Sequence, residues 1–162
     1  MHNEAYAFVR QFATDEPISV IEIGSRNING SVRMLFPNAT WTGIDLYDGP
    51  GVDVVGSALD YVPPDTVDAV ICCEVFEHAA EWRELISHAR WCLESGGKFI
   101  ITCAGPGRAP HSHIDGCQLR DDEFYENVSV DELRDALTDA GLTVVICTQL
   151  GNDTQALAML LS

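Results

Sequence analysis

The residues best suited to bind a ligand follow the first apolar segment, in "VIEIGSRNINGS" (residues 20–31). Gly24 and Gly30 bound a loop whose backbone can approach a ligand closely, because glycine has no side chain to keep the ligand away. Asp45 stands 21 residues after Gly24, at the end of the second apolar segment. A carboxylate there can accept hydrogen bonds from two ribose hydroxyls. A glycine loop followed by such an acid predicts a site for a cofactor that contains ribose.

Two residues argue against a dinucleotide in this loop. A pyrophosphate is bound by G-x-G-x-x-G at the start of a helix, and Arg26 occupies the place of the second glycine. Glu22, just before the loop, adds negative charge that suits an amino group or a sulfonium better than a pyrophosphate. A nicotinamide enzyme is therefore the least favoured of the functions we consider.

A second group of reactive side chains lies in residues 104–128, a polar loop long enough to indicate a functional or mobile segment. His111 and His113 are candidate catalytic bases, because a neutral imidazole can remove a proton from an attacking hydroxyl or amine. An equal alternative is that both are solvated loop histidines. With Cys117 and the upstream Cys103 they have the chemical types of zinc ligands, but their spacing fits no standard zinc site. We therefore expect no metal.

Four other polar residues favour structural roles. Glu77 and His78 would open the helix after the fourth strand, where an acid stabilises the positive end of a helix. Cys72 would be a packed residue of the strand itself. Tyr125 would either help to close the pocket or pack under the loop.

The elements that must position these residues alternate along the chain. The apolar pattern predicts helices at residues 3–14, 29–36, 79–97 and 129–141, and strands at residues 18–24, 40–47, 51–58, 66–75, 98–105, 142–150 and 153–162. Asn29 or Ser31 would cap the second helix, and the pair Gly96-Gly97 would end the third. Ser129 and Glu132 have the spacing of a capping box for the fourth.

This alternation predicts an α/β fold. Mostly apolar strands suit a parallel sheet covered on both faces. The last two strands are joined by a turn at Gly151-Asn152, too short for a parallel crossover, so one of them should run antiparallel. The length of 162 residues fits a single domain over residues 1–162.

Composition restricts the partners and the location. The formal net charge of −16 disfavours general nucleic-acid binding, because the surface repels phosphate backbones. The sequence has no apolar run long enough for a membrane span and no N-terminal signal peptide. Six scattered cysteines without a C-x-x-C pair indicate free thiols in a reducing compartment. We expect a cytoplasmic protein without a membrane partner.

Four segments together carry a resemblance to a known family. "VIEIGSRNING", "WTGIDLYDGPGVDVVGSALD", "TVDAVICCEVFEH" and "CLESGGKFIITCAGPG" resemble successive motifs of the class I S-adenosylmethionine-dependent methyltransferases, in particular small bacterial methyltransferase-domain proteins. The resemblance covers the chain from about Ile18 onward. It implies a Rossmann-like three-layer sandwich with a seven-stranded sheet of order 3-2-1-4-5-7-6, in which strand 7 is antiparallel.

The resemblance also implies a role for particular residues. Glu22 and Gly24 would face the methionine part of S-adenosylmethionine, with Cys73 and Glu74 at its border, and Asp45 would hold the ribose. Leu46, Ser57 and Ala58 would lie at the adenine, and Ser25, Arg26 and Gly30 would complete the loop around the cofactor. The chain departs from the family pattern in its glycine loop and in Ser57, which stands where the family often has an acid.

The predicted function is transfer of a methyl group from S-adenosylmethionine to an unidentified acceptor. Such a displacement needs alignment and an unprotonated nucleophile more than a catalytic triad. The 104–128 loop and the leading helix would shape the acceptor side. The chain has no inserted substrate domain, so we expect a large acceptor, or a homodimer or a closing loop around a small one. The alternative is a non-catalytic cofactor-binding or interaction module that keeps the fold.

Overall fold

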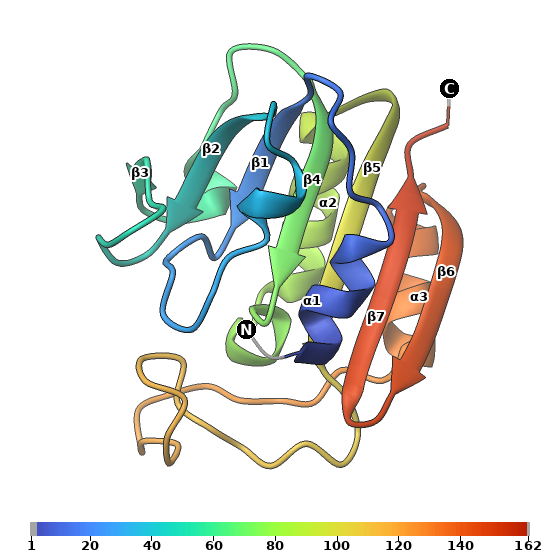
Figure 1. Ribbon diagram of the computed structural model, residues 1–162. Coiled ribbons are helices and arrows are strands. Elements are labelled where there is room, and N and C mark those ends of the chain that lie inside the picture. Colours follow the sequence, from blue (N-terminus) through green and yellow to red (C-terminus); the bar gives the residue numbers. More distant parts are fainter. Residues whose placement is uncertain (1–2, 162) are drawn as a thin grey trace.

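The computed structural model describes residues 3–161 and has a central seven-stranded sheet between helical layers (Figure 1). The strands are β1 (Ser19–Ile23), β2 (Thr40–Asp45), β3 (Val54–Val55), β4 (Val67–Cys73), β5 (Leu93–Ala104), β6 (Thr143–Leu150) and β7 (Asp153–Met159). The α-helices are α1 (Asn3–Arg10), α2 (Trp82–Cys92) and α3 (Val130–Asp139). Three short 3₁₀ helices are η1 (Arg33–Leu35), η2 (Ala58–Asp60) and η3 (Phe76–His78).

The strand order is β3-β2-β1-β4-β5-β7-β6, as predicted. β7 runs antiparallel to both β5 and β6, and the other pairs are parallel. From β1 the chain builds outward to β3 and then returns to β4 on the other side of β1. In such sheets, the carboxyl ends of the strands beside this reversal form a crevice that binds ligands.

The two faces of the sheet are buried by different helices, which gives three layers. On β4, Val70 and Cys72 pack in the cluster that contains α2 and α3, whereas Ala69 and Ile71 pack in the cluster that contains α1. Alternate residues of a strand point to opposite faces, so a continuous apolar run is needed to fill both layers. Figure 1 shows α1 in front of the sheet, with α2 and α3 behind it.

The predicted helix at residues 29–36 is wrong. Only η1 forms there, with Val32 in the N-cap position, although the Ser31 hydroxyl accepts from the Arg33 N–H at 3.2 Å. The segment is short, and Pro37 disfavours helical geometry in the residue before it. The Arg33 guanidinium also donates hydrogen bonds away from this segment, to β1 and to the loop after β2.

The predicted end of the helix at Gly96-Gly97 is also wrong, because α2 ends at Cys92. Leu93 is extended and pairs with Val67 as the first residue of β5. The two glycines lie inside β5, where the pairing register with β4 shifts between Val67 and Ala69. Glycine within a strand is typical of such an irregularity.

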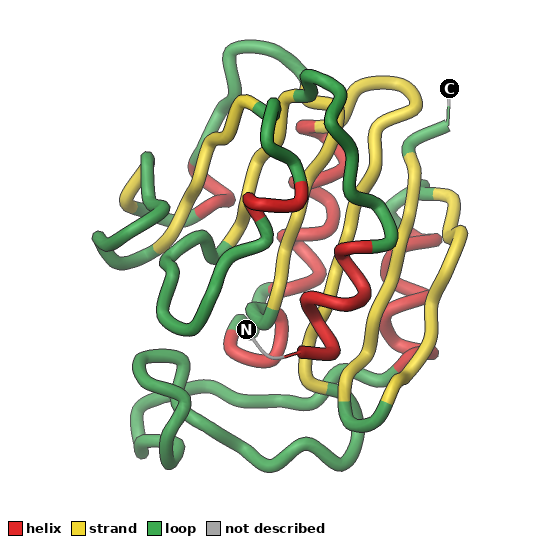
Figure 2. The backbone as a smooth tube through the Cα atoms, in the orientation of Figure 1, coloured by secondary structure: helices red, strands yellow, loops and turns green. Residues whose placement is uncertain are grey.

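The capping box of α3 is confirmed. The Ser129 side chain accepts from the Glu132 backbone N–H, and the Glu132 side chain accepts from the Ser129 backbone N–H. Residues 105–129 form the predicted long loop, without a helix or strand (Figure 2). Within residues 3–161, no helix is long and apolar enough to cross a membrane.

Candidate cofactor and acceptor site

A cavity of about 880 Å³ lies at the carboxyl ends of β1, β2 and β4 and under part of the 105–129 loop. This is the volume range of sites for small molecules and cofactors. Every residue that the sequence analysis put forward for the cofactor or for catalysis lines it: Glu22, Gly24, Ser25, Arg26, Gly30, Asp45, Leu46, Ser57, Ala58, Cys73, Glu74, His111 and His113.

Gly24 ends β1 in a conformation that only glycine adopts readily. Its φ is +74°, and a methyl group at this position would overlap the Val75 side chain. The N–H groups of Gly24 and Ser25 both donate to the Ile44 carbonyl, at 2.9 and 3.1 Å. The loop therefore turns tightly across the end of β2, and the missing Gly24 side chain leaves room for Val75, which also lines the cavity.

Asp45 is fixed at the end of β2 by two backbone donors. Its Oδ2 accepts from the Arg26 N–H at 3.1 Å, and its Oδ1 accepts from the Tyr47 N–H at 3.0 Å. A carboxylate has about four acceptor sites, so Asp45 can still accept hydrogen bonds from a ligand. The Arg26 guanidinium lies 5.1 Å from the centre of the Tyr47 ring and donates to the Ile114 carbonyl at 3.4 Å.

Glu22 has a partner that the sequence did not indicate. Arg33 donates from Nε to Glu22 Oε2 at 2.8 Å and from a terminal nitrogen to the Gly51 carbonyl at 2.6 Å. Burial raises the pKa of Glu22, and the Arg33 guanidinium opposes this increase. The negative charge expected beside the glycine loop is therefore shared with Arg33.

The outer rim combines an exposed apolar residue with polar groups. Leu46 is 64% exposed, although it lines the cavity. Ser57 caps η2, because its Oγ accepts from the Leu59 N–H at 3.2 Å, and Ala58 beside it is buried. Ser25 is buried, and its hydroxyl, which lies against Gly43, has no hydrogen-bond partner.

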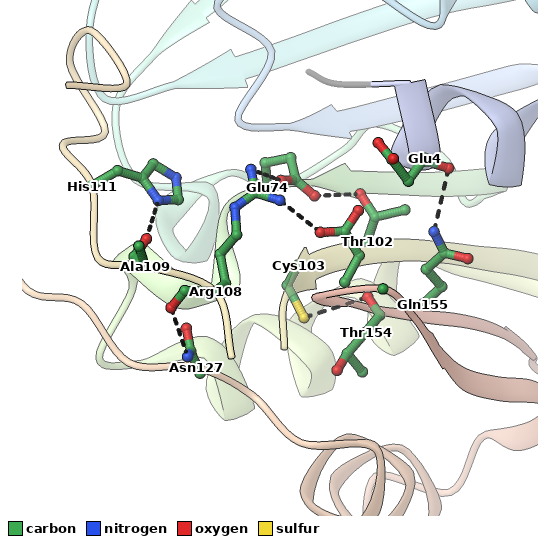
Figure 3. A network of polar contacts seen from close by, with 12 residues as sticks. Glu4, Glu74, Thr102, Cys103, Arg108, Ala109, His111, Asn127, Thr154 and Gln155 are labelled. Atoms are coloured by element: carbon green, nitrogen blue, oxygen red, sulfur yellow. Dashed lines mark hydrogen bonds and ion pairs between the residues drawn. The ribbon is translucent and has the colours of Figure 1, made fainter. Parts of the chain in front are cut away.

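Glu74 follows β4 directly and has a strained backbone. Its φ is +59°, the one positive φ of a non-glycine residue within residues 3–161; such strain clusters at functional sites. Thr102 Oγ1 donates to Glu74 Oε1 at 3.0 Å, and Arg108 lies 4.0 Å from the other oxygen (Figure 3). Arg108 also donates to Asp153 at 2.7 Å. The first residue after β4 is thus held by groups from β5 and the loop.

The two cysteines at the end of β4 are poor nucleophiles at neutral pH. Burial raises the pKa of the Cys73 thiol to about 12 and raises that of Cys72 well above its ordinary value. Cys72 is fully buried in β4, as predicted. All six cysteines are free thiols, which confirms that the fold has no disulfide framework.

The 105–129 loop passes below the carboxyl ends of the strands, where it contributes residues 108–113 and 116–118 to the cavity (Figure 1). His113 stacks on Tyr47 with ring centres 5.7 Å apart, and its Nδ1 lies 2.9 Å from Glu123 Oε1. Ser112, which is buried, donates to the same Glu123 oxygen at 2.7 Å. No residue of α1 lines the cavity, so the expectation that the leading helix shapes the acceptor side is wrong; α1 packs on β5 and β7 instead.

His111, His78 and Tyr125 form an aromatic group at the acceptor end of the cavity. The His111 ring lies 4.9 Å from that of His78 and 5.1 Å from that of Tyr125. His111 Nδ1–H donates to the Ala109 carbonyl at 3.2 Å, and the Tyr125 hydroxyl donates to the same carbonyl at 3.4 Å. Tyr125 therefore packs under the loop and against the two histidines.

The interpretation of Glu77 as an acid that stabilises the start of a helix is wrong. Glu77 lies in η3, is fully buried, and neither carboxylate oxygen has a hydrogen-bond partner. Burial, and then the charge of Glu74, raise its pKa well above the ordinary value, although the Arg108 guanidinium and nearby backbone amides favour the charged form. His78 is also largely buried, and burial lowers its pKa to about 4. The sequence could not show this, because burial of η3 depends on the loop that covers it.

Comparisons with known proteins agree with this architecture. A family model described as a methyltransferase domain matches residues 1–146. A search of curated protein sequences finds no match. The similar solved structures include the Burkholderia thailandensis 1,6-didemethyltoxoflavin-N1-methyltransferase with bound 1,6-didemethyltoxoflavin and S-adenosylhomocysteine. Its TM-score is 0.75 at 17% identity, covering 99% of this chain and 78% of that one.

Two further structures give similar values. The complex of DhpI with S-adenosylhomocysteine has a TM-score of 0.73 at 17% identity and covers 98% of this chain and 84% of that one. A SAM-dependent methyltransferase from Aquifex aeolicus has a TM-score of 0.69 at 17% identity, and the match covers 98% of this chain and 90% of that one. At this identity the structures establish the shared fold.

Proposed function

Because this chain belongs to the methyltransferase-domain family, we propose that it transfers a methyl group from S-adenosylmethionine to an acceptor bound in the same cavity. The observation that carries this proposal is the convergence of the glycine loop, Asp45 and the loop histidines on one cavity of about 880 Å³. These residues come from three separate parts of the chain. A site of this size with a few convergent polar groups is typical of a ligand-binding site.

The described residues fit the cofactor. Asp45 would accept from the ribose hydroxyls, and Gly24 would allow the methionine part to approach the backbone. Ser25, which also lines the cavity, would contact the cofactor beside Gly24. Leu46, Ser57 and Ala58 would contact the adenine, Glu22, Cys73 and Glu74 would border the methionine part, and Arg26 and Gly30 would complete the wall. When bound, S-adenosylmethionine supplies a methyl group on a sulfonium.

His113 is the better candidate for the catalytic base. Its Nδ1–H can donate to Glu123 at 2.9 Å, which leaves the lone pair of Nε2 free to accept a proton. A carboxylate that orients an imidazole in this way is a recurring arrangement in catalysis. His111 also lines the cavity and is the second candidate.

The reaction balances with this assignment. The acceptor oxygen or nitrogen would form a bond to the methyl carbon while the carbon–sulfur bond breaks. The sulfur keeps the electron pair and becomes a neutral thioether. The acceptor loses its proton to His113. Alignment of the reacting atoms is the main contribution required of the protein.

The loop over the cavity supports an acceptor that enters beneath residues 105–129, either a small molecule or a protruding group of a macromolecule. Partial cover by the loop would let a single chain form the site, and a homodimer would cover it further. A net charge of −16 favours an acceptor other than a general nucleic-acid backbone.

A non-catalytic cofactor-binding module is the second candidate. It is favoured by the use of Ser57 Oγ for the Leu59 N–H and of Glu22 for Arg33, since both groups are then partly occupied within the protein.

A labelled-methyl assay separates the two functions. The protein is incubated with S-adenosylmethionine carrying a tritiated methyl group and with small-molecule and macromolecular fractions of a cell extract. Methyl transfer predicts label in one fraction, and loss of that label with Asp45→Ala. Cofactor binding without label in any fraction would contradict the catalytic proposal and support the binding module.

A further inference from the structure

Three potential metal ligands converge at the acceptor end of the cavity, outside the residues assigned to the cofactor. Glu77 and His78 come from η3, and His111 comes from the 105–129 loop. One ligand atom of each lies within 4.8 Å of the other two. The zinc-like set considered from the sequence does not gather here, since Cys103 is directed to the Thr154 carbonyl (Figure 3) and His113 to Glu123.

Glu77 is the strongest indication of a missing partner. It is fully buried, and neither carboxylate oxygen has a hydrogen-bond partner of ordinary geometry, although the backbone amides of Glu77 and Ala104 lie close enough to favour its charged form. An unpaired carboxylate in such a position is costly, so it must either take up a proton or be matched by a cation. The Arg108 guanidinium opposes the rise in the pKa of Glu77, but its hydrogen bond goes to Asp153 at 2.7 Å, and it lies beside Glu74.

Each of the two histidines has a ring nitrogen that no described donor or acceptor occupies, and a ligand atom of one lies within 4.8 Å of a ligand atom of the other. Nδ1 of His78 is buried without a partner. His111 donates its Nδ1–H to the Ala109 carbonyl at 3.2 Å (Figure 3), which leaves the lone pair on Nε2. Metal-binding histidines usually donate their second nitrogen to a carbonyl or carboxylate, because this fixes the ring and its tautomer.

We propose that Glu77, His78 and His111 bind a divalent transition-metal ion of the zinc or manganese type. One carboxylate with two imidazoles is a known ligand set for such ions. Metal–ligand distances of about 2.0–2.2 Å require the three atoms to move closer than they lie here. His111 belongs to the loop and can make most of that movement.

The ion would have one coordination position open to the cavity, because two of its ligands, His78 and His111, line the cavity. Three protein ligands and one open position are typical of catalytic metal sites. In that position the ion would hold an oxygen atom of the acceptor. This role rests on the proposed methyl transfer, whereas metal binding itself does not.

The test is a titration of chelator-treated protein with Co²⁺, followed by visible absorbance and by calorimetry, without cofactor or acceptor. The proposal predicts one bound equivalent, weakened at least about tenfold in Glu77→Gln and in His111→Asn. His88→Gln is the matched control, since His88 is also a partly buried histidine with an unpaired nitrogen, and it should bind as the wild type does. Absence of stoichiometric binding, or equal binding in all three variants, would overturn the proposal.

Folding and cofactor binding are followed separately. Glu77→Gln removes a buried ionisable group without a close partner, so its metal-free form should melt no lower than metal-free wild type. Co²⁺ should raise the melting temperature of the wild type and of His88→Gln but not that of Glu77→Gln. A melting temperature that rises equally in wild type and Glu77→Gln would contradict the site. S-adenosylmethionine is titrated into the metal-free protein as an independent readout; if it fails to bind while Co²⁺ binds, only the proposed function fails.

Discussion

Arg33 donates from Nε to Glu22 Oε2 at 2.8 Å, and this ion pair joins the residue after the glycine loop to the strand before it. The Glu22 side chain is 12% exposed, so the pair is largely shielded from water. The same arginine reaches the Gly51 carbonyl and thereby also fixes the loop after β2. This guanidinium therefore links β1, η1 and the loop after β2 beside the cavity.

Replacing Arg33 with leucine should lower the free energy of unfolding by about 1–3 kcal/mol, because the Glu22 carboxylate would stay buried without its donor. The double variant Arg33→Leu/Glu22→Gln should recover part of the loss, since it also removes the stranded charge. Urea denaturation of the four proteins of this cycle gives the coupling. A coupling near zero would show that the pair does not hold the wall.

Gly24→Ala should destabilise the protein by about 3 kcal/mol, because the new methyl group combines a positive φ with overlap on Val75. Gly151 is the matched control, with a φ of +60° and nothing within 4 Å of an added Cβ. Gly151→Ala should therefore cost only the backbone strain, about 1 kcal/mol. Thermal unfolding of both variants measures the two losses of stability. Equal losses would argue against close packing of Val75 on Gly24.

The sequence predicted the features that depend on neighbouring residues. The apolar runs placed all seven strands, and the Ser129–Glu132 spacing placed the cap of α3, because a cap is a contact over three residues. The tight turn at Gly151-Asn152 was enough to predict that one of the last two strands runs antiparallel, and the family resemblance implied that this strand is β7. The positions of Gly24 and Asp45 at adjacent strand ends followed from the parallel order.

Features that depend on distant contacts could not be predicted. The helix expected at residues 29–36 is replaced by η1, where Arg33 is directed to Glu22 and Gly51. Gly96 and Gly97 lie in β5, where its pairing register with β4 shifts, and not at the end of a helix. Glu77 was expected at an exposed helix start, but the fold buries it completely.

Asp68 should make stability depend on pH in the acid range. Its Oδ2 accepts from the backbone N–H and the hydroxyl of Ser19, each at 2.7 Å, and these bonds hold its pKa below the ordinary value. The pKa of Asp68 in the folded protein is thus lower than its pKa in the unfolded chain, which is about 3.9. The stabilisation is present above the unfolded pKa and is lost as the pH falls through the folded pKa.

The measurement is the free energy of unfolding of wild type and Asp68→Asn between pH 7 and pH 3. The difference between the two should be largest near neutrality and should shrink below about pH 4. Asp65→Asn, an exposed neighbour, is the control and should track the wild type. A difference for Asp68→Asn that stays constant with pH would contradict the assignment.

His113→Asn should lower kcat by about 100-fold or more while cofactor affinity is unchanged, because it removes the proposed base but not a cofactor contact. Glu123→Gln should give a smaller loss, since it only weakens the orientation of the imidazole. The assay uses the acceptor that the labelled-methyl experiment identifies, with His88→Gln as the control. A kcat equal to that of the wild type would exclude His113 as the base.

Cofactor binding tests the central claim most directly. Calorimetric titration of the purified protein with S-adenosylmethionine, S-adenosylhomocysteine and NAD should show micromolar binding of the first two and none of NAD. Asp45→Ala should weaken that binding by about 1–3 kcal/mol, the cost of losing hydrogen bonds to a charged acceptor, whereas the nearby Asp48→Ala should not. Failure of S-adenosylmethionine and S-adenosylhomocysteine to bind, or equal affinity in Asp45→Ala and the wild type, would contradict the account.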